Sequence, residues 1–261
     1  MYSKKAYAKV NIFLKIAGKR NDYHELVSRF CRVQNLYDIV HFVPNDLGAF
    51  SLKGDFGCAM KNNTIYKVYS LLCTKFPKVK EFFQTHGVEV EKNIPEFAGL
   101  GGGSSDAATF MLMCNEVLDL RLNKDELNLI GQQVGADIPF FIYEYDSANV
   151  TGIGEIVEKF DEPILDIEVI TPAVKCDTGA IFRTYAKYGH NVLSKDEAET
   201  LLAMNSMEIF ETYSIEYAND LYQSAVKCNK SLQKVTSTQN DKKYFFSGSG
   251  SSFFTLNSIG Q

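Results

Sequence analysis

Hydrophobic and polar residues alternate near the beginning of the chain. From residue 6 to residue 16, one face of an extended chain carries only small or aliphatic side chains: Ala6, Ala8, Val10, Ile12, Leu14 and Ile16. A period of two residues predicts a strand with one buried face. Lys9 and Asn11 lie on the opposite face and therefore point the same way. A polar turn is expected over residues 18–24 and further strand over residues 26–43.

The pattern then changes to helical spacing. Apolar residues recur every three or four positions after Asn63, which is a favourable helix cap, and Pro77 is expected to end this helix. A short strand over residues 88–92 and a helix from about residue 104 to residue 118 follow. The segment between these two elements is a loop rich in glycine.

Two capping boxes mark helix starts further along the chain. Asn123 with Glu126, and Ser194 with Glu197, have the spacing at which both side chains bind backbone N–H groups of one first helical turn. Gly135 is expected to end the helix that follows Asn123. Both segments are therefore predicted to be helical.

The C-terminal half mixes strands and helices without a regular repeat. A strand is expected over residues 164–171, helices near Thr178 and Glu216, and two apolar strands joined by a Gly/Ser turn over residues 244–256. Because the elements do not form successive βαβ units, the predicted fold class is α+β.

A domain boundary is expected at the segment Asp-Glu-Pro, residues 161–163. The N-terminal domain would cover residues 1–160, including the glycine-rich loop. The C-terminal domain would cover residues 161–261.

Composition and charge exclude several classes of protein. The chain of 261 residues is 45% hydrophobic and 23% charged, as globular proteins are, and its net charge of −5 argues against a sequence-independent nucleic-acid binder. The six cysteines form no Cys-x-x-Cys pair, so buried free thiols in a reducing compartment are expected, and the scattered histidines disfavour a zinc site. No apolar run near the N-terminus suits a signal peptide or membrane span, which favours a cytoplasmic protein without a membrane partner.

The segment PEFAGLGGGSSDAA, residues 95–108, predicts a phosphate-binding loop. Four glycines fall within five residues, and two serines and a helix start follow them. Glycines let several backbone N–H groups turn toward one ligand, and a helix start adds partial positive charge. A flexible linker is the alternative. A P-loop would need a lysine after its last glycine, and a dinucleotide fingerprint would need glycine where Ser104 stands.

Four spaced motifs resemble those of the GHMP kinases. Residues 95–108 are similar to the second motif of that family. The segment AKVNIFLKIAGKRNDYHEL, residues 8–26, is similar to the opening of its 4-diphosphocytidyl-2-C-methyl-D-erythritol kinase branch. Residues 132–140 (QQVGADIPF) and 244–254 (YFFSGSGSSFF) resemble two later motifs. The chain departs from the branch in lacking a glycine before Tyr23, and in carrying two serines where the last motif has Pro-Thr.

The resemblance implies a two-domain GHMP kinase fold. Its N-terminal domain would resemble domain 2 of ribosomal protein S5, its C-terminal domain would be ferredoxin-like, and the active site would lie in the cleft between them. The implied reaction is ATP-dependent phosphorylation of the 2-hydroxyl of 4-diphosphocytidyl-2-C-methyl-D-erythritol, a step of non-mevalonate isoprenoid synthesis, by a monomer or weak homodimer. Two alternatives stay open: a GHMP kinase for another small alcohol, such as homoserine or mevalonate, and a nucleotide-binding module without catalysis.

The same resemblance assigns catalysis to Asp137 and Lys9. Asp137 lies in an otherwise apolar run, so its carboxylate needs a cationic or hydrogen-bonding partner, and Lys9 could supply it. The alternatives are that Asp137 only caps the helix that begins at Ile138, and that Lys9 is a surface lysine.

Binding residues are also implied by the resemblance. The substrate-binding set is Asn11, Tyr23, His24, Thr178 and Phe182, with the cytosine stacked between aromatic rings. The ATP-binding set is Asn63, Lys92, Pro95, Ala98, Gly99, Leu100, Gly101, Gly102, Gly103, Ser104 and Ser105. Mg²⁺ is expected to accompany ATP, with no protein ligand assigned. Phe182 could instead be plain helix core, and Asn63 plain helix cap.

Overall fold

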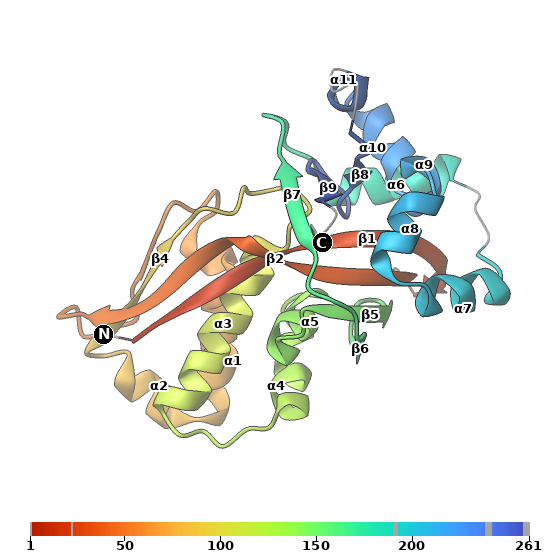
Figure 1. Cartoon of the computed structure of the whole chain (residues 1–261). Helices are drawn as coiled ribbons and strands as arrows, with labels where there is room; N and C mark the ends of the chain where they lie inside the picture. Colours follow the sequence, from red (N-terminus) through yellow and green to blue (C-terminus); the bar gives the residue numbers. More distant parts are fainter. Residues whose placement is uncertain (1, 22, 190–192, 238–241, 258–261) are drawn as a thin grey trace. The chain divides into compact units, whose positions relative to one another are not determined.

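The computed structural model describes residues 2–21, 23–189, 193–237 and 242–257, and the chain forms two compact units. The first unit consists of residues 1–8, 35–94 and 101–144, and the second of residues 9–34, 95–100 and 145–261. Strands β1 (Tyr2–Arg20) and β2 (Tyr23–Pro44) pair with each other and contribute residues to both units (Figure 1). The sequence-based boundary near residue 160 divides the chain differently and stays a prediction.

The first unit combines a sheet with a group of helices. Residues 39–44 of β2 run antiparallel to β4 (His86–Glu91), and β3 (Leu52–Lys53) runs parallel to β4. The helices are η1 (Met60–Asn62), α1 (Thr64–Lys75), α2 (Pro77–Phe82), α3 (Gly102–Val117), α4 (Lys124–Gly131) and α5 (Ile138–Tyr143). Both α1 and α5 pack against α3, the helix that follows the glycine-rich loop (Figure 1).

Helix α3 is the centre of the first unit's core. Every residue from 105 to 114 is buried, and Ala107 and Ala108 are small enough to let neighbouring helices approach closely. On the sheet side, the rings of Phe42 and Phe110 meet edge to face with centroids 5.7 Å apart. The start of α3 is therefore held by a tightly packed helix body.

The second unit contains strands of the six-stranded sheet to which β1 to β4 also belong, and a second sheet of three strands. Residues 26–31 of β2 pair with β5 (Ser147–Gly152), which pairs with β6 (Ile156–Lys159), all antiparallel. The separate three-stranded sheet has the order β7-β9-β8, with β7 (Asp166–Ile170), β8 (Phe245–Phe246) and β9 (Phe253–Asn257). The helices are α6 (Thr178–Tyr188), α7 (Lys195–Ala203), α8 (Ser206–Thr212), α9 (Ile215–Ala218), α10 (Tyr222–Cys228) and α11 (Leu232–Ser237).

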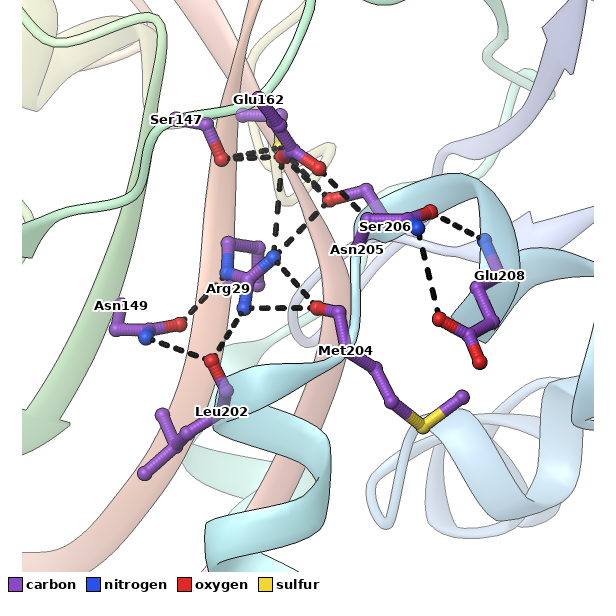
Figure 2. Close-up of polar contacts among 10 residues, drawn as sticks. Arg29, Ser147, Asn149, Glu162, Leu202, Met204, Asn205, Ser206 and Glu208 are labelled. Atoms are coloured by element: carbon purple, nitrogen blue, oxygen red, sulfur yellow. Dashed lines mark hydrogen bonds and ion pairs between the residues drawn. The ribbon is translucent and has the colours of Figure 1, made fainter.

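A buried polar network joins several elements of the second unit (Figure 2). The fully buried Arg29 donates hydrogen bonds to Asn149 and to the carbonyl oxygens of Leu202 and Met204. Glu162 lies 3.8 Å from the Arg29 guanidinium and accepts hydrogen bonds from the backbone and hydroxyl of Ser206. The turn between α7 and α8 is thereby tied to strands β2 and β5.

The predicted mixture of strands and helices is confirmed, and so are both capping boxes. The prediction that α1 ends before Pro77 is confirmed, and Pro77 also starts α2, since proline fits the first helical position. Two details were wrong. Helix α4 ends at Gly131 instead of near Gly135, because residues 132–134 form a turn. Strand β1 is buried on both faces from residue 8 to residue 16, because other elements cover its polar face as well.

The sequence also predicted that the cysteines are buried free thiols and that no segment near the N-terminus spans a membrane. All six cysteines are free; Cys31, Cys114 and Cys176 are buried as expected, Cys73 is half-buried, and Cys58 and Cys228 are exposed. The expectation of buried thiols is therefore confirmed for three of the six and was wrong for the two exposed ones. Within the described residues, no helix combines the length and apolar character that crossing a bilayer requires.

Candidate active site

The start of α3 has the geometry expected of a phosphate-binding loop. Gly101 takes a left-handed conformation (φ 72°) immediately before the helix, and no side chain of the described residues caps this end. The N–H groups of a first helical turn have no partner within the helix, so an anion can accept their hydrogen bonds. A flexible linker does not fit, because this segment runs directly into the buried helix α3.

Neighbouring residues hold this helix start closely. A Cβ atom on Gly102 would lie 2.9 Å from Cγ2 of Ile94, so only glycine fits there without displacement. The Thr64 hydroxyl donates a 2.6 Å hydrogen bond to the carbonyl oxygen of Gly103. Asn63 caps α1 by accepting the N–H of Ile65 at 2.9 Å, which confirms its capping role. A contact of Asn63 with adenine stays a prediction.

Lys92 lies between two buried carboxylates. Its ammonium donates to Asp38 and, at 2.6 Å, to Asp106, the fifth residue of α3. Burial raises the pKa of Asp106 to about 7, against the opposing effect of Lys92. Burial also disfavours the charged form of Lys92, but Asp106 and Asp38 outweigh this effect and raise its pKa. Neither carboxylate was predicted from sequence, since nothing local marks Asp38 as a partner of Lys92.

Asp137 precedes α5 as its half-buried N-cap residue. Its backbone is close to helical (φ −85°, ψ −12°), and its side chain accepts no capping hydrogen bond from the first turn of α5. The interpretation of Asp137 as a plain helix cap is therefore not supported by the geometry. The carboxylate lies in the same compact unit as the start of α3.

Lys9 and Asn11 form a buried polar pair in the second unit. The Lys9 ammonium donates a 2.6 Å hydrogen bond to Oδ1 of Asn11, whose amide donates to the hydroxyl of Ser28 at 3.0 Å. Lys9 is only 3% exposed, so the surface-lysine alternative was wrong. Its ammonium also lies 4.4 Å from the centre of the Phe30 ring. Its predicted partnership with Asp137 stays a prediction.

The structure brings the second and fourth sequence motifs together in the second unit. Gly99 (φ 75°) accepts a 2.9 Å hydrogen bond from the Ser247 hydroxyl through its carbonyl oxygen, and the N–H of Ser252 donates to the carbonyl of Ala98. The amide of Asn219 in turn donates 2.9 Å hydrogen bonds to the carbonyls of Phe246 and Gly248. Asn219 therefore has a structural role in shaping the last motif.

The remaining residues of the ATP-binding set differ in accessibility. Pro95 and Gly103 are exposed, and Ser104 is half-buried. Leu100 is buried, and its carbonyl accepts the N–H of Lys9 at 3.0 Å. Ser105 is buried in the first turn of α3, with its N–H donating to the Gly101 carbonyl.

The predicted cytidine-binding residues cluster in the second unit. The rings of His24 and Phe182 stack at 5.4 Å with an interplanar angle of 20°, and the hydroxyls of Thr178 and Ser249 lie 2.7 Å apart. Tyr23 is 65% exposed, and Asp22 lies outside the described residues. Burial, with Lys19 acting in the same direction, lowers the pKa of His24 and favours its neutral form.

The described residues contain no group of three or more carboxylate, thiol or imidazole side chains that could hold a metal ion.

Comparisons with known proteins agree with this geometry. Residues 63–145 match the family model described as the GHMP kinases N terminal domain. The 4-diphosphocytidyl-2-C-methyl-D-erythritol kinase of Sulfurimonas denitrificans is 51% identical, with 97% of this chain and 96% of the relative covered. The enzyme of the same name from Helicobacter pylori strain J99 is 42% identical, with 96% and 92% covered.

The chain belongs to the 4-diphosphocytidyl-2-C-methyl-D-erythritol kinase family of GHMP kinases. A crystal structure of 4-(cytidine 5'-diphospho)-2C-methyl-D-erythritol kinase superposes with a TM-score of 0.77 at 28% identity, covering 98% of this chain and 90% of the other. A crystal structure of mevalonate kinase superposes with a TM-score of 0.68 at 14% identity, covering 99% of this chain and 92% of the other. This likeness shows the shared fold. The predicted GHMP kinase fold is thus confirmed.

Proposed function

We propose that this chain is an ATP-dependent kinase that phosphorylates the 2-hydroxyl of 4-diphosphocytidyl-2-C-methyl-D-erythritol in the non-mevalonate isoprenoid pathway. The observation that carries this proposal is the uncapped start of α3 behind the glycine run, in a chain whose family membership extends over nearly its full length. We expect it to act in the cytoplasm as a monomer or weak homodimer.

The glycine-rich loop is proposed to bind the triphosphate of ATP. Backbone N–H groups at the start of α3, together with the hydroxyls of Ser104 and Ser105, would bind the phosphate oxygens and stabilise the charge that develops during transfer. Lys92 and Asn63 are the side chains proposed for the nucleotide beyond this loop. Mg²⁺ would enter with ATP and neutralise phosphate charge.

Asp137 is proposed as the group that receives the proton of the acceptor hydroxyl. As the hydroxyl oxygen forms its bond to the γ-phosphorus, the bond from that phosphorus to the β,γ-bridging oxygen breaks and ADP leaves. A carboxylate hydrogen-bonded to the hydroxyl both orients it and takes its proton. Lys9, held by Asn11, would supply positive charge beside the reacting groups.

Recognition of the cytidine part is proposed for Tyr23, His24, Thr178, Phe182 and Asn11. A neutral imidazole has one donor and one acceptor nitrogen, so His24 can pair with the polar edge of a pyrimidine. Aromatic rings such as Phe182 offer faces on which a base can stack. The His24 ring stacks on one face of Phe182.

An assay of ADP release with a panel of alcohols tests this function. We expect turnover with 4-diphosphocytidyl-2-C-methyl-D-erythritol and none above background with homoserine or mevalonate. Calorimetric titration with CDP should show binding. Turnover of another alcohol in preference, together with no binding of CDP, would overturn the substrate assignment. ATP binding without turnover of any alcohol would leave only a nucleotide-binding module.

A further inference from the structure

The carboxylate of Asp38 organises the turn that leads into the glycine-rich loop. Asp38 is fully buried on β2, and its Oδ1 accepts the backbone N–H groups of Asn93 at 2.5 Å and Ile94 at 2.8 Å. Its Oδ2 accepts the ammonium of Lys92. One side chain therefore fixes three consecutive residues directly after β4.

Lys92 connects this turn to the other end of the loop. Its ammonium also binds Oδ2 of Asp106, the fifth residue of α3, which is 2% exposed. Gly102 packs against Ile94 so closely that a Cβ atom would fall 2.9 Å from its side chain and 3.8 Å from Oδ2 of Asp38. Both contacts join residues 92–94 to the helix start, so the two ends of the loop are held together.

The buried ion pairs of Lys92 with Asp38 and Asp106 contribute little net stability to the fold. Two carboxylates and one ammonium are buried together, and buried ion pairs roughly break even against apolar packing. Oδ1 of Asp106 is buried and has no hydrogen-bond partner among the described residues. An unpaired buried oxygen lowers the stability of the fold, which favours a role for Asp106 other than stabilisation.

We propose that Asp38 and Asp106 are positioning residues for ATP, which act through Lys92 to fix the phosphate-binding N–H groups at the start of α3 relative to residues 92–94. They need not touch the nucleotide. Small displacements of such groups weaken phosphate binding, because the N–H groups must converge on the same phosphate oxygens. This inference rests on the proposed function, since it concerns the ATP site of that kinase.

Calorimetric titration of the full chain with ATP tests the proposal. Asp106→Ala removes the acceptor for Lys92 and is expected to raise the Kd for ATP about 10- to 100-fold, with the Kd for CDP unchanged. Asp106→Asn keeps an oxygen that accepts from Lys92 and should stay within about threefold of the parent protein.

Asp38→Asn gives an independent measurement. Its amide oxygen can keep the two backbone N–H bonds, while its NH₂ group faces the ammonium of Lys92 and cannot accept from it. The fold should persist while ATP binding weakens. Unchanged ATP affinity in folded Asp106→Ala or Asp38→Asn protein would overturn the proposal. An Asp106→Asn variant that binds ATP as weakly as Asp106→Ala does would also overturn it.

Asp220 provides the matched control. It is another buried carboxylate, paired with Lys15 at 2.5 Å in the second unit. Asp220→Ala should lower Tm as Asp106→Ala does, but it should not weaken ATP binding more than CDP binding. If Asp106→Ala weakens both ligands in parallel with Tm, the role is structural. Because ATP binding is measured without an acceptor, comparing the Kd for ATP with Tm across the variants does not depend on the substrate assignment, and only the comparison with CDP does.

Discussion

The buried charges of this kinase differ in what surrounds them. Lys9 is bound by a neutral amide and lies over an aromatic ring, whereas Lys92 lies between two carboxylates. The hydrogen bond to Asn11 orients the Lys9 ammonium, whereas two carboxylates hold the Lys92 ammonium between β2 and α3. Lys92 is therefore suited to holding these protein segments together.

Asp137→Asn should slow the phosphoryl transfer. The amide cannot take the hydroxyl proton, so kcat should fall about 10²- to 10⁴-fold, the usual contribution of a general base. Steady-state kinetics measures kcat, and titration with ATP should show little change in Kd. Lys9→Ala should lower kcat by a smaller factor in the Asp137→Asn background than in the parent protein, since members of one catalytic group act together. Turnover at the parent rate in Asp137→Asn would remove the assigned role.

Asp106 should make the stability of the fold depend on pH. Its pKa rises from 3.8 to about 7 on folding, so the folded state holds the proton more tightly than the unfolded chain does. The resulting stability is complete below about pH 4 and is lost as pH rises toward 7, on the order of a few kcal/mol. Lys92 and Asp38 face this carboxyl group, and their charges are already part of the shift.

Urea unfolding at several pH values measures this dependence. Between pH 4.5 and 7.5, the free energy of unfolding of the parent protein should fall relative to that of Asp106→Asn, which has no proton to lose. Parallel pH profiles for the two proteins would contradict the raised pKa.

At the level of elements, the loop preceding α3 depends on backbone conformations open to glycine. Gly99 has φ 75°, and a Cβ atom there would lie 2.1 Å from the carbonyl oxygen of Ser247. At Gly99 the segment 95–100 therefore packs directly against the backbone of the last motif, and the Gly99 carbonyl also accepts the Ser247 hydroxyl. A side chain would force the two loops of the second unit apart.

Gly99→Ala should destabilise the protein by about 2–5 kcal/mol, from the clash and the left-handed backbone together. Gly48→Ala is the matched control, because Gly48 also has a positive φ (67°) but nothing lies within 4 Å of its Cβ position. It should cost only about 1–2 kcal/mol, the backbone part of the effect. Equal losses in the two variants, measured by urea unfolding, would show that the contact with Ser247 is unimportant.

Local signals made many elements predictable, whereas long-range partners were not. The capping boxes at Asn123 and Ser194 lie within one helical turn, so sequence alone identified both helices. Helix α8 was missed, because its cap Asn205 has no distinctive apolar pattern after it. The carboxylate partner of Lys92 on β2 is 54 residues away, and only the folded sheet brings it close.

On the scale of the whole molecule, the two units have different kinds of core. The first centres on the buried helix α3 and aromatic rings such as Phe42 and Phe110. The second has an apolar cluster that includes Tyr185 and Phe253, and in addition the polar network around Arg29. In that network one guanidinium satisfies carbonyl oxygens of the turn between α7 and α8 (Figure 2).

Arg29→Ala should be among the most destabilising substitutions in the second unit. It leaves Glu162 buried without its cation, removes the Arg29 hydrogen bond to the carbonyl of Met204, and leaves the carbonyl of Leu202 with only the amide of Asn149, which together cost about 3–5 kcal/mol. Arg121→Ala is the control, because Arg121 and Asp119 form an exposed pair whose loss should not change stability measurably. Urea unfolding should separate the two variants clearly. Adding Glu162→Gln to Arg29→Ala should recover part of the loss, since it removes the unpaired charge; no recovery would mean that packing on the Phe160 ring, 3.3 Å from the guanidinium, dominates instead.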